Sequence, residues 1–212
     1  MKTTDPPPTP FTVSKARFES FSDGVFAIAI TLLILEVRLP ADASARSSSW
    51  EQARALLSIW PQYLVYAASF ATIGIMWINH HALFKEARRI THGCTLANLL
   101  LLGLISFLPF TTEVLGHFGL TPTAVVYYGL TMVAIALAYN LVHQQVYAAH
   151  GRPRPVTLWN VVGLSAYPFA TVIGYFVPLL GIIVIALLAI FYMMPNNIGA
   201  VALPPAEPSD GS

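Results

Sequence analysis

Residues 21–36 read FSDGVFAIAITLLILE, an apolar run that begins directly after a serine and an acid. A bilayer core about 30 Å thick needs about 20 mostly apolar helical residues, and this run with its flanks is long enough. Ser22 and Asp23 are residue types that often cap the start of a helix. An ionisable group near a membrane helix is costly, so the acid calls for a partner. The stretch predicts a membrane-spanning helix with one polar end.

The composition of the whole chain favours a membrane protein. Its 212 residues are 56% hydrophobic and 10% charged, whereas a soluble domain carries about 25% charged residues. Eleven Lys and Arg nearly balance ten Asp and Glu, so there is no overall basic field and we expect no nucleic-acid partner. The single cysteine, Cys94, cannot form an internal disulfide.

Six stretches have the length and apolarity of membrane helices, which predicts an all-α membrane protein with six transmembrane helices. They cover residues 18–39, 56–84, 95–115, 124–149, 158–176 and 178–194. Thr121 with Pro122 is a plausible start for the fourth helix. Pro178 predicts the break between the last two, because proline lacks a backbone donor and restricts its predecessor. Three further prolines fall inside spans, where we expect kinks: Pro61, Pro109 and Pro168.

The ends and loops complete the predicted organisation. We expect a disordered arm at residues 1–16, a six-helix domain at 17–195 and a disordered tail at 196–212, since both ends are rich in proline and polar residues. With a cytoplasmic amino terminus, eight Lys and Arg fall inside and three outside: Lys2, Lys15, Arg17, Lys85, Arg88, Arg89, Arg152 and Arg154 against Arg38, Arg46 and Arg54. This predicts a multi-pass protein of the cell membrane with both termini in the cytoplasm.

The first helix has two different sides. On a helical wheel one narrow apolar stripe gathers Phe21, Gly24, Ile28, Leu32 and Leu35, with Thr31 at its edge. Asp23 lies about 140° away from this stripe at 100° per residue. By periodicity alone such a stripe most often packs against other helices, and a pore lining is the minority interpretation.

A buried carboxylate needs a partner, and the end of the second predicted span offers several in MWINHHALF. The residues predict a polar cluster that locks the first helix against the second, formed by Arg17, Ser22, Asp23 and His80, with Trp77 and Asn79 beside them. The competing interpretation is that Ser22 and Asp23 are a plain helix cap.

Motifs for other chemistry are missing from the sequence. It contains no HExxH, no cysteine pair, no Walker motif and no GxSxG. We therefore expect no metal site, no cofactor, no small-molecule substrate and no enzyme activity.

Arg17, Phe21, Ser22 and Asp23 spell RxxxFSD before the long apolar helix, and WINHH follows at residues 77–81. In these motifs the sequence resembles prokaryotic members of the transmembrane protein 175 family of potassium channels. The resemblance implies a homotetramer in which the first helices line a central pore, without the TVGYG loop of ordinary potassium channels. It also implies potassium as the permeant ion and places the constriction, five residues after the motif's Asp, at Ile28.

The same resemblance implies pore positions at Leu32 and Leu35, with Thr31 as the hydroxyl-bearing position. Rings of Ile and Leu offer no ligands to a cation, so they would gate by sterics and dewetting, with modest potassium selectivity and leak-like conduction. Two other functions are weighed against this one. A proton-coupled secondary transporter would use Asp23 and His80 as a relay; a membrane enzyme or scaffold has no motif in its favour.

Overall fold

The computed structural model describes residues 14–40, 48–87, 89–151 and 158–192, and within them every regular element is helical. The predicted all-helical fold is thereby confirmed for the described chain. The elements are α1 (Lys15–Leu32), the 3-10 helix η1 (Leu33–Glu36), α2 (Ser49–Ser58), α3 (Trp60–Glu86), α4 (His92–Phe118), α5 (Pro122–Ala149), α6 (Leu158–Phe176) and α7 (Pro178–Tyr192).

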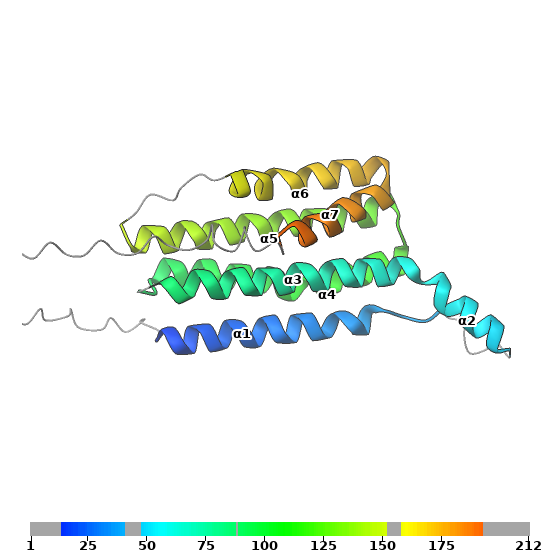
Figure 1. The fold of residues 1–212 in the computed structure, drawn as a ribbon, viewed down its shortest axis with the longest axis horizontal. Coiled ribbons are helices and arrows are strands. Elements are labelled where there is room, and N and C mark those ends of the chain that lie inside the picture. Colours follow the sequence, from blue (N-terminus) through cyan, green and yellow to red (C-terminus); the bar gives the residue numbers. More distant parts are fainter. Residues whose placement is uncertain (1–13, 41–47, 88, 152–157, 193–212) are drawn as a thin grey trace, which may run out of the picture.

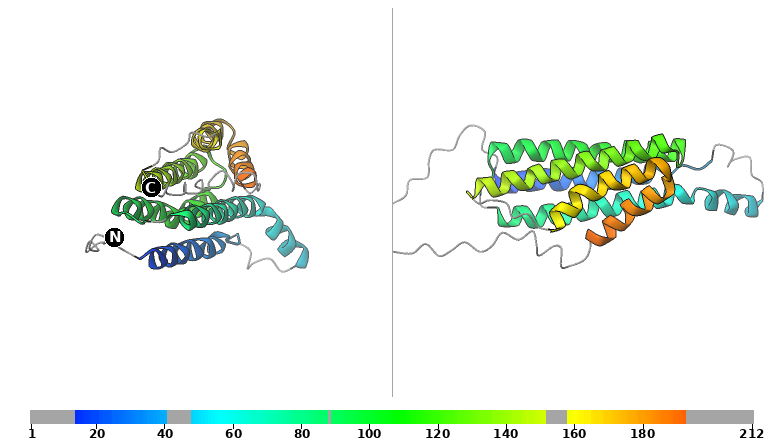
Figure 2. Two further views of the ribbon diagram at one scale, coloured as in Figure 1. Left: turned by 60° about the vertical axis from the view of Figure 1, so that its left-hand side comes forward. Right: turned by 90° about the horizontal axis from the view of Figure 1, so that it is seen from above.

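The helices form a layered bundle (Figure 1). α1 lies on one side and packs against α3 and α4, while α5 packs between α4 and α6. α7 folds back beside α6 and also contacts α3. α2 extends beyond the end of the bundle, as the two further views show (Figure 2). The layering leaves one long side of α1 uncovered by the other helices.

Several helices have the length and apolarity of membrane spans. Three pass this test alone, namely Lys15–Glu36, His92–Phe118 and Pro122–Ala149. Ser49–Ser58 and Trp60–Lys85 pass it together as one pair bent by 46°. Val161–Phe176 and Pro178–Tyr192 are shorter apolar helices.

One predicted kink is present and one predicted boundary is wrong. The span predicted at 56–84 is bent by 46° at Ile59, beside the kink expected at Pro61, because Pro61 stands in the first turn of α3 and its ring leaves no room for a helical carbonyl four residues earlier. The span predicted at 18–39 stops being helical after Glu36, where Val37 turns to an extended conformation. Leu39 precedes Pro40, and a residue before proline is disfavoured in the α region.

Other helix ends follow local signals in the sequence. Thr121 caps α5 by accepting a hydrogen bond from the backbone N–H of Ala124 at 3.4 Å, and Pro122 begins the helix, as predicted. Pro109 and Pro168 lie inside α4 and α6, which both continue through them. α1 begins at Lys15, inside the segment predicted as an arm. The rest of that arm, the predicted tail and positions 193–194 lie outside the described residues.

The predicted break at Pro178 is present and makes a tight hairpin between α6 and α7. Val177 interrupts the two helices, and its N–H donates to the carbonyl of Ile173 at 2.8 Å. Gly174 and Gly181 meet across the turn so closely that a Cβ on Gly181 would lie 2.5 Å from the Cα of Gly174. The two glycines therefore allow a helix approach that larger residues exclude.

Both ends of the α1–η1 segment are tied to α3 by hydrogen bonds. At the start, the Lys15 ammonium donates to the carbonyls of Lys85 and Ala87 at 3.0 Å each, which satisfies acceptors at the carboxyl end of α3. Just after η1, the backbone N–H of Arg38 donates to the side chain of Gln62 at 2.8 Å. These bonds fix α1 along its axis against α3.

Candidate pore face and buried polar network

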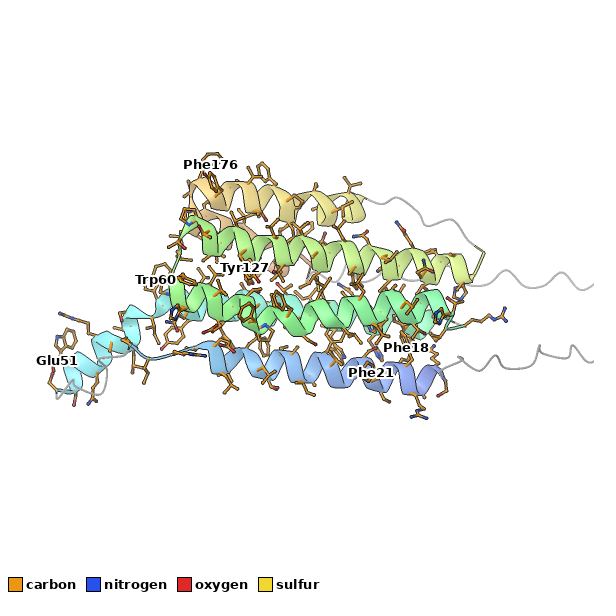
Figure 3. The ribbon with its side chains drawn as sticks, turned by 180° about the vertical axis from the view of Figure 1, so that it is seen from behind. Phe18, Phe21, Glu51, Trp60, Tyr127 and Phe176 are labelled. Carbon is orange, nitrogen blue, oxygen red and sulfur yellow. The ribbon has the colours of Figure 1, made fainter. Side chains whose placement is uncertain are left out.

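α1 buries one face and exposes the other. The buried face holds Phe18, Ser22, Phe26 and Ala29, and Phe18 points toward the rest of the bundle (Figure 3). These positions recur every three to four residues, which is the spacing of one side of a helix. The predicted apolar stripe lies on the uncovered side.

The predicted stripe residues are exposed apolar side chains. Exposed fractions are 61% for Ile28, 41% for Leu32, 65% for Leu35 and 56% for Phe21. Gly24 is exposed as well. A stripe of this kind on a helix that already packs with its other face has two possible environments in a membrane, lipid or another protein surface.

Thr31 is the polar residue beside this stripe. Its side chain is exposed, and its hydroxyl donates to the carbonyls of Ala27 and Ile28 at 3.0 and 2.9 Å within α1. Because the hydroxyl proton is used inside the helix, the oxygen presents its lone pairs outward as an acceptor.

A chain of three hydrogen bonds joins α1, α4 and α3 on the buried side. His80 donates through Nε2 to Oδ1 of Asn98 at 2.8 Å, and Nδ2 of Asn98 donates to the Ser22 hydroxyl at 2.9 Å. The Ser22 hydroxyl in turn donates to the carbonyl of Phe18 at 3.0 Å. Ser22, Asn98 and His80 are at most 2% exposed. The proton must sit on Nε2 of His80, since an amide oxygen only accepts.

Aromatic rings enclose the histidine of this chain. Ring centroids lie 4.6 Å from His80 for Phe84, 5.3 Å for Phe26 and 6.5 Å for Phe18. Water has little access to such a site, so Asn98 supplies the hydrogen bond that solvent would otherwise make.

Asp23 has a separate partner. Nε1 of Trp77 on α3 donates to Oδ1 of Asp23 at 2.8 Å, and the indole is 42% exposed. Asp23 is half-buried. This hydrogen bond ties the Asp23 side chain of α1 to α3.

The structure divides the predicted cluster in two. Ser22 and His80 are joined through Asn98, and Asp23 meets Trp77. Arg17 is exposed and Asn79 half-buried, and neither makes a hydrogen bond or ion pair to these residues within the described chain. The plain-cap interpretation is wrong, because Ser22 and Asp23 lie in the middle of α1, whose cap residue is Ser14.

Asn98 was not among the predicted site residues. Its only signal in the sequence is that it is an amide inside a long apolar run, which is a residue type that needs partners in a membrane. In the described residues there is no group of three His, Cys, Asp or Glu side chains that could hold a metal ion.

Comparisons with known proteins give one consistent family. A sequence model described as endosomal/lysosomal potassium channel TMEM175 matches residues 17–109. A protein of Chamaesiphon minutus named a potassium channel is 44% identical over 128 residues, which cover 58% of this chain and 62% of that protein. A protein of Chryseobacterium named a potassium channel is 31% identical over 193 residues, which cover 87% of this chain and 95% of that protein.

A human relative and a solved structure complete the comparison. The human protein named endosomal/lysosomal proton channel TMEM175 is 40% identical over 115 residues, but the match covers only 23% of its length. The crystal structure described as a lysosomal potassium-selective channel TMEM175 homolog from Chamaesiphon minutus has a TM-score of 0.71 and 34% identity. The match covers 84% of this chain and 95% of that one. This chain belongs to the TMEM175 family.

Proposed function

We propose that this chain forms a potassium-selective, leak-like cation channel in which four copies surround a central pore lined by α1. The observation that carries the proposal is the exposed stripe of Ile28, Leu32 and Leu35 on a helix that is packed on its opposite face. Bacterial relatives named potassium channels, and the likeness to a solved potassium-selective homolog, support potassium as the permeant ion.

The proposed membrane arrangement has six spans per subunit. The spans are α1 with η1, the bent pair α2 and α3, and then α4, α5, α6 and α7. The end of the bundle where α1 begins carries Lys15, Arg17, Lys85 and Arg89, and we call it the basic end. By the positive-inside rule the basic end faces the cytoplasm of a cell membrane.

The proposed gate is a series of apolar rings. Four symmetry-related copies of Ile28 would form the narrowest ring, with Leu32 and Leu35 in the next turns. Such rings oppose a hydrated cation by dewetting, and a weakly hydrated potassium ion loses less on partial dehydration than sodium does. Outward-facing Thr31 oxygens would offer acceptors between the rings.

The buried polar network has a supporting role in this proposal. Bonds from Ser22 and Asp23 reach α4 and α3, so α1 is held in one rotation about its axis. A fixed rotation keeps Ile28 on the opposite side, where it can meet its copies.

The test is cysteine accessibility in reconstituted single-channel recordings, with potassium and sodium on opposite sides. Ile28→Cys should make the current sensitive to a water-soluble thiol reagent, and Ile28→Asn should raise conductance and lower selectivity. Ile190→Cys on α7, where the side chain is 54% exposed, is the matched control and should be insensitive. Buried Cys94 should not react in either variant. A current that ignores the reagent at Ile28, Leu32 and Leu35 would remove all three from the pore.

A second candidate is proton transport that uses Asp23 and His80. The name of the human relative favours it. The two side chains bond to different partners, Trp77 and Asn98, which does not form a direct relay. A reversal potential that follows a pH gradient at constant potassium would support this candidate, and one that follows potassium alone would exclude it.

A further inference from the structure

The two flanks of α1 beside the pore stripe differ. At 100° per residue, Ala27 lies about 100° from Ile28 on one flank, and Ala29 lies about 100° from it on the other. Ala27 is exposed, whereas Ala29 is 2% exposed, on the flank from which Ser22 is bonded to Asn98 of α4. Within the described part of the chain, α1 is therefore covered by its own α4 on one flank and open on the other.

A groove between α1 and α3 lies on the open flank. Its volume is about 330 Å³, and its walls include Asp23, Ala27, Ile30, Ile73, Gly74 and Trp77. A Cβ on Gly74 would have Cδ1 of Ile30 as its nearest neighbour, at 3.9 Å, so the groove has room at this point. In a membrane such a groove is filled by lipid tails or by another helix.

The opposite side of the subunit carries a row of exposed residues on α4, which we call the α4 row. Its members recur every three to four positions, as on one face of a helix, and they are Leu96, Leu100, Gly103, Phe107 and Phe110. α1 and α4 both begin at the basic end, and Ser22 is bonded to Asn98. The same number of residues further along each helix come Ala27 and Gly103, which therefore lie at about the same depth.

Gly103 has no packing role within its own subunit. A Cβ at this position would meet no atom of the described chain within 4 Å outside its own helix backbone, and glycine inside a helix is less favourable than alanine. Small residues on membrane helices allow the backbone of a second helix to approach closely, whereas lipid tails adapt to any side chain. This exposed glycine therefore favours a helix of another chain against the α4 row.

A closed ring brings the α4 row and the groove together. In a cyclic assembly of more than two copies, each contact joins two different sides of the subunit, and the last copy closes on the first. With Ile28 turned toward the axis, as proposed above, the open flank of α1 in one copy faces the α4 flank of the next. This contact continues the proposed ring of α1 helices outward, and lipid is left to surfaces further from the axis.

We propose that the α4 row of each copy packs into the α1–α3 groove of the next copy, with Gly103 against Ala27. Leu100 and Phe107, which are 52% and 40% exposed, are the side chains that fill the groove on either side of this contact. The partner of the groove is thus a second copy of the chain. The proposal rests on the four-copy pore of the proposed function and adds which surfaces the copies use.

The test is disulfide cross-linking of the full chain in membranes, in a Cys94→Ala background. Ala27→Cys is combined in turn with Leu100→Cys, Gly103→Cys and Phe107→Cys. At least one pair should give a ladder of linked chains that ends at the tetramer on a denaturing gel, since every copy carries both cysteines and a disulfide needs Cα atoms within about 7 Å. Each cysteine alone should give no ladder.

Leu137→Cys on α5 replaces the α4 cysteine in the matched control and should give no ladder. Leu137 is 53% exposed. It lies at about the depth of Gly103, because Ser69 is bonded to both Thr112 of α4 and Tyr128 of α5, and these two helices are antiparallel neighbours. The control therefore differs from the test pair in the side of the subunit and not in membrane depth.

The size of the side chain at position 103 gives a second test. Gly103→Leu should leave the helical circular dichroism unchanged, since the position is open within the subunit, but should lose the tetramer in native mass spectrometry. Leu137→Trp, an enlargement at the same depth on α5, should keep the tetramer.

The proposal is overturned if no pair with Ala27→Cys links, if the Leu137→Cys control links as well, or if Gly103→Leu still forms the tetramer. Ala27→Cys that reacts fully with a membrane-soluble maleimide in the assembled tetramer would also overturn it and give the groove to lipid. The proposed function fails in a different way. A current blocked at Ile28→Cys without any ladder contradicts this contact alone, whereas an insensitive Ile28→Cys contradicts the central ring of α1 helices.

Discussion

Replacing Asn98 by alanine should be among the most damaging single changes to this fold. The substitution removes the bonds of 2.8 Å to His80 and 2.9 Å to Ser22. Each such bond contributes about 1 kcal/mol, and a buried donor left without a partner costs about 1–3 kcal/mol more. Interhelical hydrogen bonds in membranes average only about 0.6 kcal/mol. We therefore expect a loss of about 2 kcal/mol in the free energy of unfolding.

The measurement is reversible unfolding of the purified chain in mixed micelles of increasing denaturing detergent. Asn79→Ala is the matched control, since Asn79 is a half-buried amide next to His80 without a bond to the network, and it should cost under about 0.5 kcal/mol. A double-mutant cycle of Asn98→Ala with His80→Phe should give a coupling of about 1 kcal/mol. Equal losses for Asn98→Ala and Asn79→Ala, or zero coupling, would refute the reasoning.

Three further substitutions test other contacts. Gly181→Ala places a Cβ 2.5 Å from the Cα of Gly174, so thermal unfolding should reveal a loss of about 1–3 kcal/mol, and an unchanged midpoint would show that the hairpin can open at no cost. Trp77→Phe keeps an aromatic side chain but removes the N–H donor to Asp23 and should cost about 1 kcal/mol in the same assay; a neutral result would assign the carboxylate another partner. Lys15→Met should speed hydrogen exchange at the carboxyl end of α3, which would stay slow if the ammonium were dispensable.

Much of the fold could be predicted from the sequence because membrane helices are specified locally. About twenty apolar residues in a row determine a span, and the turn at Pro178 and the start of α5 at Pro122 follow from the geometry of proline. The division of α1 into two faces also followed from its period, since Ile28 is exposed and Ser22 is buried. The kink expected at Pro61 is present as the 46° bend beside it, but the sequence did not predict that Pro61 would stand in the first turn of a new helix.

The partners within the network could not be predicted in the same way. Asn98 is separated by 18 residues from His80 and by 76 from Ser22, so no local pattern connects them. Only the packing of α1, α3 and α4 brings Ser22, His80 and Asn98 to the same height along the bundle, where they can form hydrogen bonds. The sequence could identify polar residues that needed partners, but helix rotation and axial offset decide which ones meet.

The bonds at the two ends of the α1–η1 segment limit how the proposed pore lining can move. Sliding α1 by one residue is a displacement of about 1.5 Å along its axis. That shift would pull the Lys15 ammonium off the carbonyls of Lys85 and Ala87 and would separate the Arg38 amide from Gln62. Rolling α1 about its own axis would break the bonds of Ser22 to Asn98 and of Asp23 to Trp77, whereas tilting α1 breaks fewer bonds. A change in the width of the proposed pore therefore requires α1 to move sideways, with the two ends of the α1–η1 segment acting as pivots.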